Sequence, residues 1–177
     1  MRSIQENLTQ YAAYHRDRRN IATHFVGVPM IVFSIILALN VAHFSVGPVQ
    51  ATLAVVVAVA AILYYVALDV VLGITMAAIL LLMCAGASEI TARTTTGGAL
   101  GWALAIFVVG WALQYWGHYF EGMKPAFYDD VKQLLIGPVF VLAEAFFLFG
   151  AKPELRRYIE DRVGPTVARR TGATPTA

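Results

Sequence analysis

Three long stretches of the chain contain no charged residue, and their lengths predict helices that cross a membrane. No Asp, Glu, Lys or Arg occurs in residues 20–68, 70–88 or 94–120. A crossing helix needs roughly 20 consecutive apolar residues, so the first stretch has room for two crossings and each of the others for one. The pattern therefore predicts an all-α integral membrane helical bundle with full crossings at residues 23–44, 50–68, 70–87 and 99–120.

Short breaks separate these predicted crossings. Gly47-Pro48 interrupts the first stretch, and Asp69 marks a very tight turn before the third crossing. Residues 89–98 form a polar connection that is rich in Thr and Gly. At the start of the fourth crossing, Gly97 and Gly101 are two small residues four positions apart, a spacing that would let two helices approach closely.

The N-terminal segment, residues 1–19, is predicted to lie at the membrane interface. Residues 3–14 have a helical rhythm, which indicates a short amphipathic helix, with one apolar face made by Ile4, Leu8, Tyr11 and Ala12. Residues 15–19 form a charged break. Asn20 follows the break and is well placed to cap the first crossing, because its side-chain oxygen can accept from the free N–H groups of the next turn.

The last apolar run, residues 134–150, is short and contains a Gly-Pro pair and Glu144. Cytoplasmic loops carry most of the Lys and Arg of a membrane protein. Here the basic residues cluster before the first crossing, near Lys124 and Lys132, and in residues 152–170. A fifth crossing would place the last cluster outside. The run is therefore predicted to be re-entrant or shallow, with both termini cytoplasmic.

Composition supports a single membrane domain. Hydrophobic residues make up 59% of the chain and charged residues 14%, whereas a soluble domain carries about a quarter charged residues. Residues 1–163 are predicted to form this domain, and residues 164–177 a disordered tail. The first apolar run is too long for a cleaved signal peptide and is followed by further crossings. An Ala- and Val-rich chain with short loops suits a bacterial inner membrane, or the endoplasmic reticulum if the host is eukaryotic.

Three of the four histidines are expected to meet at one side of the membrane. His15 and His24 lie before and just inside the first crossing, and four crossings return His118 to the same side. At about 1.5 Å per residue, the helix from His24 to His43 puts His43 nearly 30 Å away. The charged break after His15 would let both N-terminal imidazoles face inward.

Converging imidazoles indicate a metal site. Imidazole suits iron, zinc or copper, and a nearby carboxylate biases the choice towards Fe(II). Glu121 is three residues after His118, on the same helix face, and is a fourth candidate ligand. The simpler alternatives are histidines that anchor the chain at the interface and a Glu121 that pairs with Lys124.

The surrounding charged residues allow two interpretations. Four cations, Arg16, Arg18, Arg19 and Lys124, fit cytoplasmic anchors, and they also fit a site for an anionic substrate head group. Glu144 needs a partner within an apolar segment, and one option is a hydrogen bond to a ligating histidine. Asn20 is the other residue expected to lie next to the ligating histidines and support them.

These residues together resemble a known family. The pattern consists of Tyr14-His15, Asn20, His24 and Pro29, then Gly117-His118, Glu121, Pro125-Ala126 and the Gly137-Pro138 to Glu144 stretch. It resembles the fungal-type 2-hydroxy fatty acid dioxygenases, small membrane proteins that were formerly a domain of unknown function. The resemblance spans about residues 8–156.

The resemblance implies an Fe(II)-dependent dioxygenase that shortens a 2-hydroxy fatty acid by one carbon during alpha-oxidation. His15, His24 and His118 would be the catalytic, iron-binding histidines. The hydroxyl and carboxylate of a 2-hydroxy acid can chelate iron and leave one position for O2. The acyl tail would lie among the apolar helices. In the fungal pattern the glutamate follows the histidine by four residues, whereas Glu121 follows His118 by three, which turns it by about 100° on the helix.

The alternative class is a non-enzymatic membrane protein, either a small transporter or an assembly protein with structural histidines. A transporter would place ionisable groups through the membrane midplane. In this chain they gather at one face apart from Glu144, which favours the enzyme. The chain has no HExxH motif, no glycine pattern for nucleotides and no basic-aromatic pattern for nucleic acid.

Overall fold

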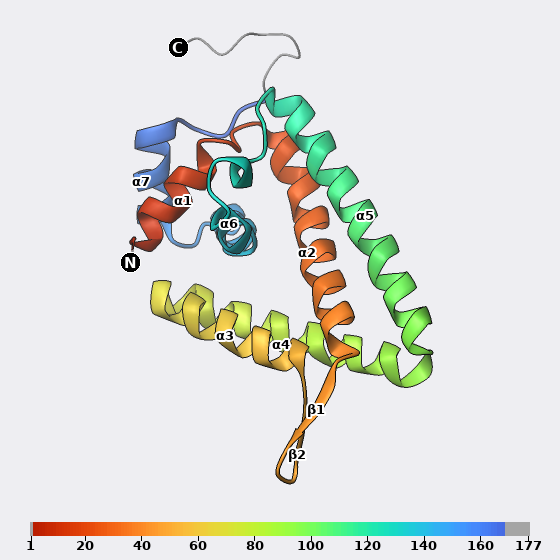
Figure 1. The fold of residues 1–177 in the computed structure, drawn as a ribbon. Coiled ribbons are helices and arrows are strands. Elements are labelled where there is room, and N and C mark those ends of the chain that lie inside the picture. Colours follow the sequence, from red (N-terminus) through yellow and green to blue (C-terminus); the bar gives the residue numbers. More distant parts are fainter. Residues whose placement is uncertain (1, 169–177) are drawn as a thin grey trace. The chain divides into compact units, whose positions relative to one another are not determined.

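A computed structural model describes residues 2–168 of the chain (Figure 1). This part of the chain is mostly helical, as the apolar pattern predicts. It contains seven α-helices, one short 3-10 turn at Ala126–Tyr128 and a single β-hairpin. The α-helices are α1 (Ile4–Ala12), α2 (Arg18–Asn40), α3 (Leu53–Leu68), α4 (Val70–Arg93), α5 (Thr96–Glu121), α6 (Gln133–Leu148) and α7 (Pro153–Val163).

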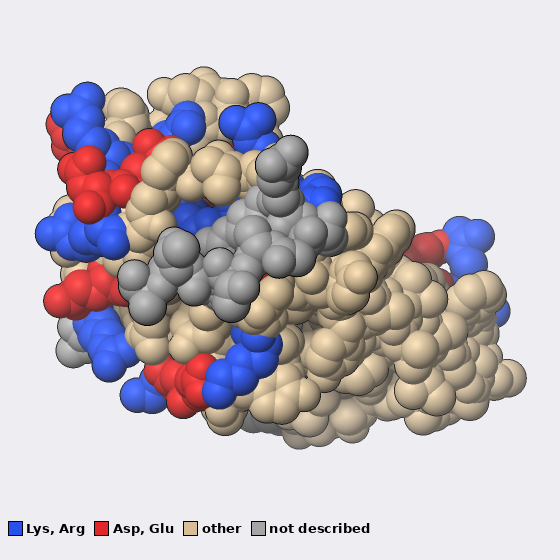
Figure 2. All heavy atoms as spheres, turned by 90° about the horizontal axis from the view of Figure 1, so that it is seen from above, with Lys and Arg blue, Asp and Glu red and all other residues tan. Residues whose placement is uncertain are grey.

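The chain divides into two compact units. The first comprises residues 1–28 and 111–177, and the second comprises residues 29–110. Charge is divided unevenly between them. Only three charged residues, Asp69, Glu89 and Arg93, belong to the second unit. The others belong to the first unit, and Figure 2 shows many of them as blue and red side chains on its surface.

Three described helices are long and apolar enough to cross a membrane, namely α2, α4 and α5. Helix α3 is apolar but has 16 residues, which gives a length of about 24 Å against a hydrocarbon core of about 30 Å. Helices α6 and α7 meet at an angle of 111°, the geometry of a broken span or a re-entrant loop. Four full crossings and a re-entrant run at residues 134–150 therefore stay predictions.

A β-hairpin replaces the end of the first predicted crossing and the start of the second. Helix α2 begins at Arg18 instead of residue 23 and ends at Asn40. Strands β1 (His43–Val46) and β2 (Val49–Thr52) then pair antiparallel, with His43 opposite Thr52. The predicted bounds of 23–44 and 50–68 were wrong here because Gly47-Pro48 forms a two-residue turn between the strands. Gly47 has φ +59°, which costs glycine little.

Buried Asn40 secures the base of this hairpin within the second unit. Its side-chain amide donates to Thr91 Oγ1 at 2.9 Å, and Thr52 Oγ1 donates to its carbonyl oxygen at 3.0 Å. Thr52 also accepts from Val55 N and so caps the start of α3. One polar cluster therefore fixes where α2 ends and where α3 begins.

Helices α3 and α4 are separated by Asp69 alone, as the tight turn predicts. The Asp69 carboxylate accepts from Leu72 N at 2.9 Å and caps α4. At Gly73, a Cβ would lie 2.5 Å from Val66 Cα, so glycine is needed for this close approach. Helix α4 continues to Arg93 instead of ending at residue 87, and Glu89 pairs with Arg93 one turn later. Most of the expected connection at 89–98 is therefore helical.

In the first unit, α1 packs against α6 and α7 (Figure 1). Ser3 and Glu6 form a capping box at its start, and the side of α1 that is buried carries the apolar residues expected there: Ile4, Leu8, Tyr11 and Ala12. A helix is therefore present at Ile4–Ala12, while an amphipathic helix at a membrane interface stays a prediction. Of the predicted tail at 164–177, residues 164–168 are described, and Val167 forms a parallel bridge with Asp17. The remainder lies outside the described residues.

We expect Gly73→Ala to destabilise the second unit. The added methyl must push α3 and α4 apart, and overpacking of this kind costs about 1–3 kcal/mol. Thermal unfolding of the purified protein in detergent measures the effect. The matched control is Gly101→Ala, because a Cβ at Gly101 meets no atom within 4 Å and alanine is the better helix former. Equal melting temperatures for the two variants would contradict this account of the α3–α4 contact.

Candidate metal centre

Three histidines from distant parts of the chain converge within the first unit. His15 lies between α1 and α2, His24 lies on α2 and His118 on α5. Each offers one ligand atom, and these atoms all lie within 4.8 Å of one another. The ring centroids are 4.6 Å apart for His15 and His24, 4.8 Å for His15 and His118, and 5.3 Å for His24 and His118. All three side chains are buried.

The hydrogen bonds of His15 and His24 fix the tautomer of each ring. Nδ1 of His15 lies 2.7 Å from Tyr11 O, and Nδ1 of His24 lies 2.9 Å from Asn20 O. A carbonyl oxygen only accepts, so each Nδ1 must carry the proton. The two Nε2 atoms are 3.1 Å apart. In the neutral rings both are lone-pair acceptors that face each other without a proton between them, an arrangement that a shared cation would stabilise.

His118 completes a donor set that fits a transition metal. Its Nδ1 is buried and has no hydrogen-bond partner in the described part of the chain. Imidazole donors suit iron, zinc and copper. The residues present therefore fit a metal ion held by three neutral imidazoles. The three come from different segments of the chain: the connection before α2, α2 itself and α5.

The residue before His118 lets α5 approach α2. A Cβ at Gly117 would overlap Thr23 Oγ1 and would lie 2.5 Å from Asn20 Oδ1. Any side chain at this position would push the end of α5 away from the first turn of α2. His118 would then move away from His24. Gly117 thus has a direct part in bringing the two rings together.

Aromatic residues cover the other side of His15. The Tyr11 ring stacks on the His15 ring, with centroids 4.1 Å apart and an angle of 3° between the planes. Phe140 of α6 lies 4.8 Å from the Tyr11 ring and 5.6 Å from the His15 ring. Tyr11 and Phe140 are both buried. They hold His15 in one orientation and keep water away from it.

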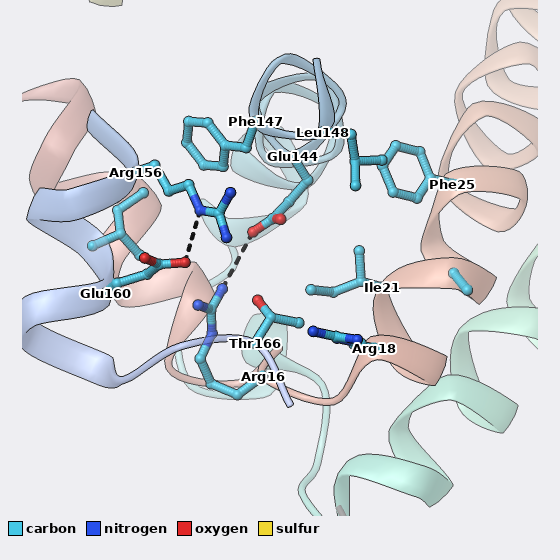
Figure 3. Close-up of a pocket in the computed structure, with 12 residues that line it drawn as sticks. Arg16, Arg18, Ile21, Phe25, Glu144, Phe147, Leu148, Arg156, Glu160 and Thr166 are labelled. Atoms are coloured by element: carbon cyan, nitrogen blue, oxygen red, sulfur yellow. Dashed lines mark hydrogen bonds and ion pairs between the residues drawn. The ribbon is translucent and has the colours of Figure 1, made fainter. Parts of the chain in front are cut away.

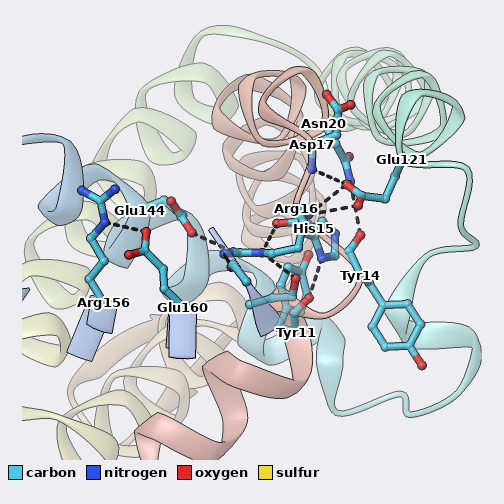
Figure 4. A network of polar contacts seen from close by, with 12 residues as sticks. Tyr11, Tyr14, His15, Arg16, Asp17, Asn20, Glu121, Glu144, Arg156 and Glu160 are labelled. Carbon is cyan, nitrogen blue, oxygen red and sulfur yellow. Dashed lines mark hydrogen bonds and ion pairs between the residues drawn. The ribbon is translucent and has the colours of Figure 1, made fainter. Parts of the chain in front are cut away.

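Glu121 contacts the chain between α1 and α2. Its carboxylate accepts from Arg16 N at 3.0 Å, from Asp17 N at 2.8 Å and from Asn20 Nδ2 at 3.1 Å (Figure 4). It is buried and is not one of the three grouped ligands. Its place as a fourth ligand stays a prediction, but these bonds give it a different role. They tie the residue after His15 to the helix that carries His118.

Three of the four cations expected to hold a substrate head group already have carboxylate partners. Arg16 is buried and pairs with Glu144 at 3.3 Å. Arg19 pairs with Asp17 at 2.8 Å, and Lys124 pairs with Asp129 at 2.6 Å. Glu144, expected near a ligating histidine, thus bonds Arg16 instead. Asn20 does lie next to the centre, through the bond from its carbonyl oxygen to His24.

Sequence reasoning missed several residues that build this site. Tyr11 lies four residues before His15, which follows the end of α1, and its carbonyl accepts from the His15 ring. The apolar pattern explained Tyr11 only as packing. Gly117 gave a weak signal as part of a Gly-His pair. Val167 gave none, yet its N–H donates to Arg16 O at 2.9 Å and its carbonyl accepts from Arg18 N at 3.0 Å. Such pairing between distant backbones leaves no mark in a single sequence.

We expect Glu121→Gln to destabilise the centre. The amide replaces one acceptor oxygen with an NH2 group, which leaves a buried backbone N–H without its partner and costs on the order of 3 kcal/mol. Thermal unfolding and the metal retained per chain should both fall. Glu89→Gln is the matched control, because Glu89 is exposed on α4 and pairs only with Arg93 among the described residues. Unchanged stability and metal content in Glu121→Gln would contradict the role assigned to Glu121.

Acid should destabilise the metal-free protein. Burial lowers the pKa of His15 well below its ordinary value of 6.5, and the two neighbouring histidines lower it further. Below about pH 6.5 the unfolded chain therefore binds more protons than the folded chain, so the free energy of unfolding falls as the pH falls.

The measurement is the melting temperature of the metal-free protein between about pH 7 and about pH 5. His15→Gln should have a lower melting temperature at neutral pH and a shallower dependence on pH. His43→Gln changes an exposed histidine of β1 and should keep the wild-type slope. Equal slopes for wild type and His15→Gln would contradict the assignment.

Comparison with known proteins identifies a family for the chain. The chain matches the family model described as Mpo1-like, 2-hydroxy-palmitic acid dioxygenase Mpo1-like, over residues 1–148. It is also 27% identical over 160 residues to the 2-hydroxy-palmitic acid dioxygenase MPO1 of Saccharomyces cerevisiae, which covers 89% of this chain and 87% of the yeast protein. No solved structure matches the chain. The three histidines lie within the matched region, and the chain belongs to the Mpo1-like family.

Proposed function

We propose that this protein is a membrane-bound, Fe(II)-dependent dioxygenase that shortens 2-hydroxy fatty acids by one carbon. The observation that carries the proposal is the pair of bare Nε2 atoms, 3.1 Å apart, on His15 and His24. Membership of a family described by a dioxygenase activity supports the reaction class. The yeast relative acts, by its name, on 2-hydroxy-palmitic acid, so a long-chain 2-hydroxy acid is the substrate class proposed here.

The iron would supply the redox chemistry that couples O2 to oxidation of the 2-hydroxy acid. The chain's own residues have other tasks. His15, His24 and His118 would hold the ion as neutral imidazoles, and the carbonyls of Tyr11 and Asn20 orient two of those rings. The stacked ring of Tyr11 and the ring of Phe140 exclude water from one side of the site.

The proposed enzyme works at the cytoplasmic face of the membrane. Every Lys and Arg except Arg93 belongs to the first unit, which contains the three histidines. The N-terminal helix, the loop after α5 and helix α7 belong to the same unit. Because basic residues favour the cytoplasmic side, we propose that both termini lie there and that four crossings connect them.

Metal analysis of the purified protein tests the centre. We expect about one iron per chain, because three imidazoles make one site for a transition metal, and we expect its loss in His118→Ala. His43→Ala is the control, since His43 lies in β1 outside the group. A wild-type protein that contains no transition metal would end the proposal and leave a non-enzymatic membrane protein with structural histidines.

Oxygen uptake tests the substrate class. Uptake with 2-hydroxypalmitate should greatly exceed uptake with palmitate, because only the hydroxy acid offers two adjacent oxygen donors to the ion. The acid one carbon shorter should accumulate in proportion. Iron in the protein without uptake on any 2-hydroxy acid would keep the metal centre and remove the assigned reaction.

A further inference from the structure

A pocket with a charged end and an apolar end lies in the first unit (Figure 3). Its volume is about 520 Å³, within the range of ligand sites in proteins. It lies between α2, α6, α7 and the segment after α7. None of the three histidines lines it, so it is separate from the donor set of the metal centre.

Helix α2 supplies a lining that changes from charged to apolar along its length. The lining residues lie at spacings of three, four and seven, which places them on one helix face: Arg18, Ile21, Ala22 and Phe25. Across the pocket, Phe147 and Leu148 of α6 continue the apolar end. Figure 3 shows Leu148 beside Phe25, with Arg18 and Thr166 at the other end. The lining matches a molecule with a polar head and an apolar chain.

The charges at the polar end leave one cation in excess. Arg16 pairs with Glu144 at 3.3 Å, and Arg156 pairs with Glu160 at 2.8 Å (Figure 3). Arg18 also lines the pocket, and its guanidinium has no ion-pair partner among residues 2–168. A guanidinium binds a carboxylate through two parallel N–H groups. The Arg18 guanidinium could therefore bind the anionic head group of a ligand in this pocket.

We propose that this pocket binds one long-chain carboxylic acid, with its carboxylate at Arg18 and its acyl chain along Ile21, Phe25 and Leu148. The single apolar stripe fits one chain, whereas a phospholipid carries two. The choice of a fatty acid as the anion rests on the proposed function, but the site does not need the metal. Of the cations expected at a head-group site, Arg16 and Arg18 line this pocket, whereas Arg19 and Lys124 do not and pair with Asp17 and Asp129.

The test is binding of radiolabelled palmitate to the full-length protein in phosphatidylcholine nanodiscs. Palmitate has no 2-hydroxyl group, so it reports this pocket without two-point attachment to a metal. We expect saturable binding that weakens at least about tenfold in Arg18→Gln, the effect of losing one charge-assisted contact, and that largely returns in Arg18→Lys. Ala22→Leu should also weaken binding, because the larger side chain fills the pocket without changing a charge.

Matched controls separate this site from its surroundings. Arg157→Gln removes a neighbouring exposed cation of α7 that does not line the pocket, and it should bind palmitate as the wild type does. Melting temperatures of all variants identify any loss that comes from unfolding. A folded Arg18→Gln protein with wild-type binding overturns the proposal, as does a loss caused by Arg19→Gln in its place. Displacement of palmitate by phosphatidylglycerol at low mole fraction would also overturn it, because the ligand would then be a lipid phosphate.

Failure of this inference can be told apart from failure of the enzyme assignment. Iron content and oxygen uptake with 2-hydroxypalmitate are measured on the same preparations. His118→Ala should lose iron and uptake but keep palmitate binding that depends on Arg18. A wild type with iron and uptake but no palmitate binding would reject the pocket alone. Palmitate binding that disappears with the metal would also reject a separate site.

Discussion

The candidate metal centre depends on the buried carboxylate of Glu121. It accepts hydrogen bonds from two consecutive backbone N–H groups, at Arg16 and Asp17, and from the side chain of Asn20. These groups lie more than 100 residues earlier in the chain. A buried carboxylate is stable only when its lone pairs are satisfied, so the charge itself holds the start of α2 against the end of α5. This contact keeps His15 and His24, which lie around the start of α2, close to His118 on α5.

Much of the arrangement follows from the sequence because it is encoded in spacing. The absence of charge predicts helices, and the number of crossings predicts that His118 returns to the side of His15 and His24. The structure brings these three rings together. The roles of Glu121 and Glu144 were less predictable. A carboxylate can bind a metal, an arginine or backbone N–H groups, and the distances that decide between these partners come only from the folded chain.

The hairpin at residues 43–52 shows a second limit of hydropathy. Its strands contain no Asp, Glu, Lys or Arg, like the apolar runs on either side, so the absence of charge cannot separate strands from helices here. Two local features do so: the Gly47-Pro48 turn and the buried amide of Asn40, which bonds Thr52 and Thr91. The partners of this amide lie on two other segments, so the hydropathy of residues 40–52 alone does not reveal them. The same holds for the ion pair of Arg16 and Glu144.

The family match ends at residue 148, whereas α7 spans Pro153–Val163 and the segment that follows it pairs with Asp17. The three histidines therefore lie within the residues that match the family model, while α7 follows them, although the similarity to the yeast relative covers 89% of the chain and so extends into α7. A substitution after residue 148 would therefore change the lining of the proposed pocket and leave the three grouped histidines in place.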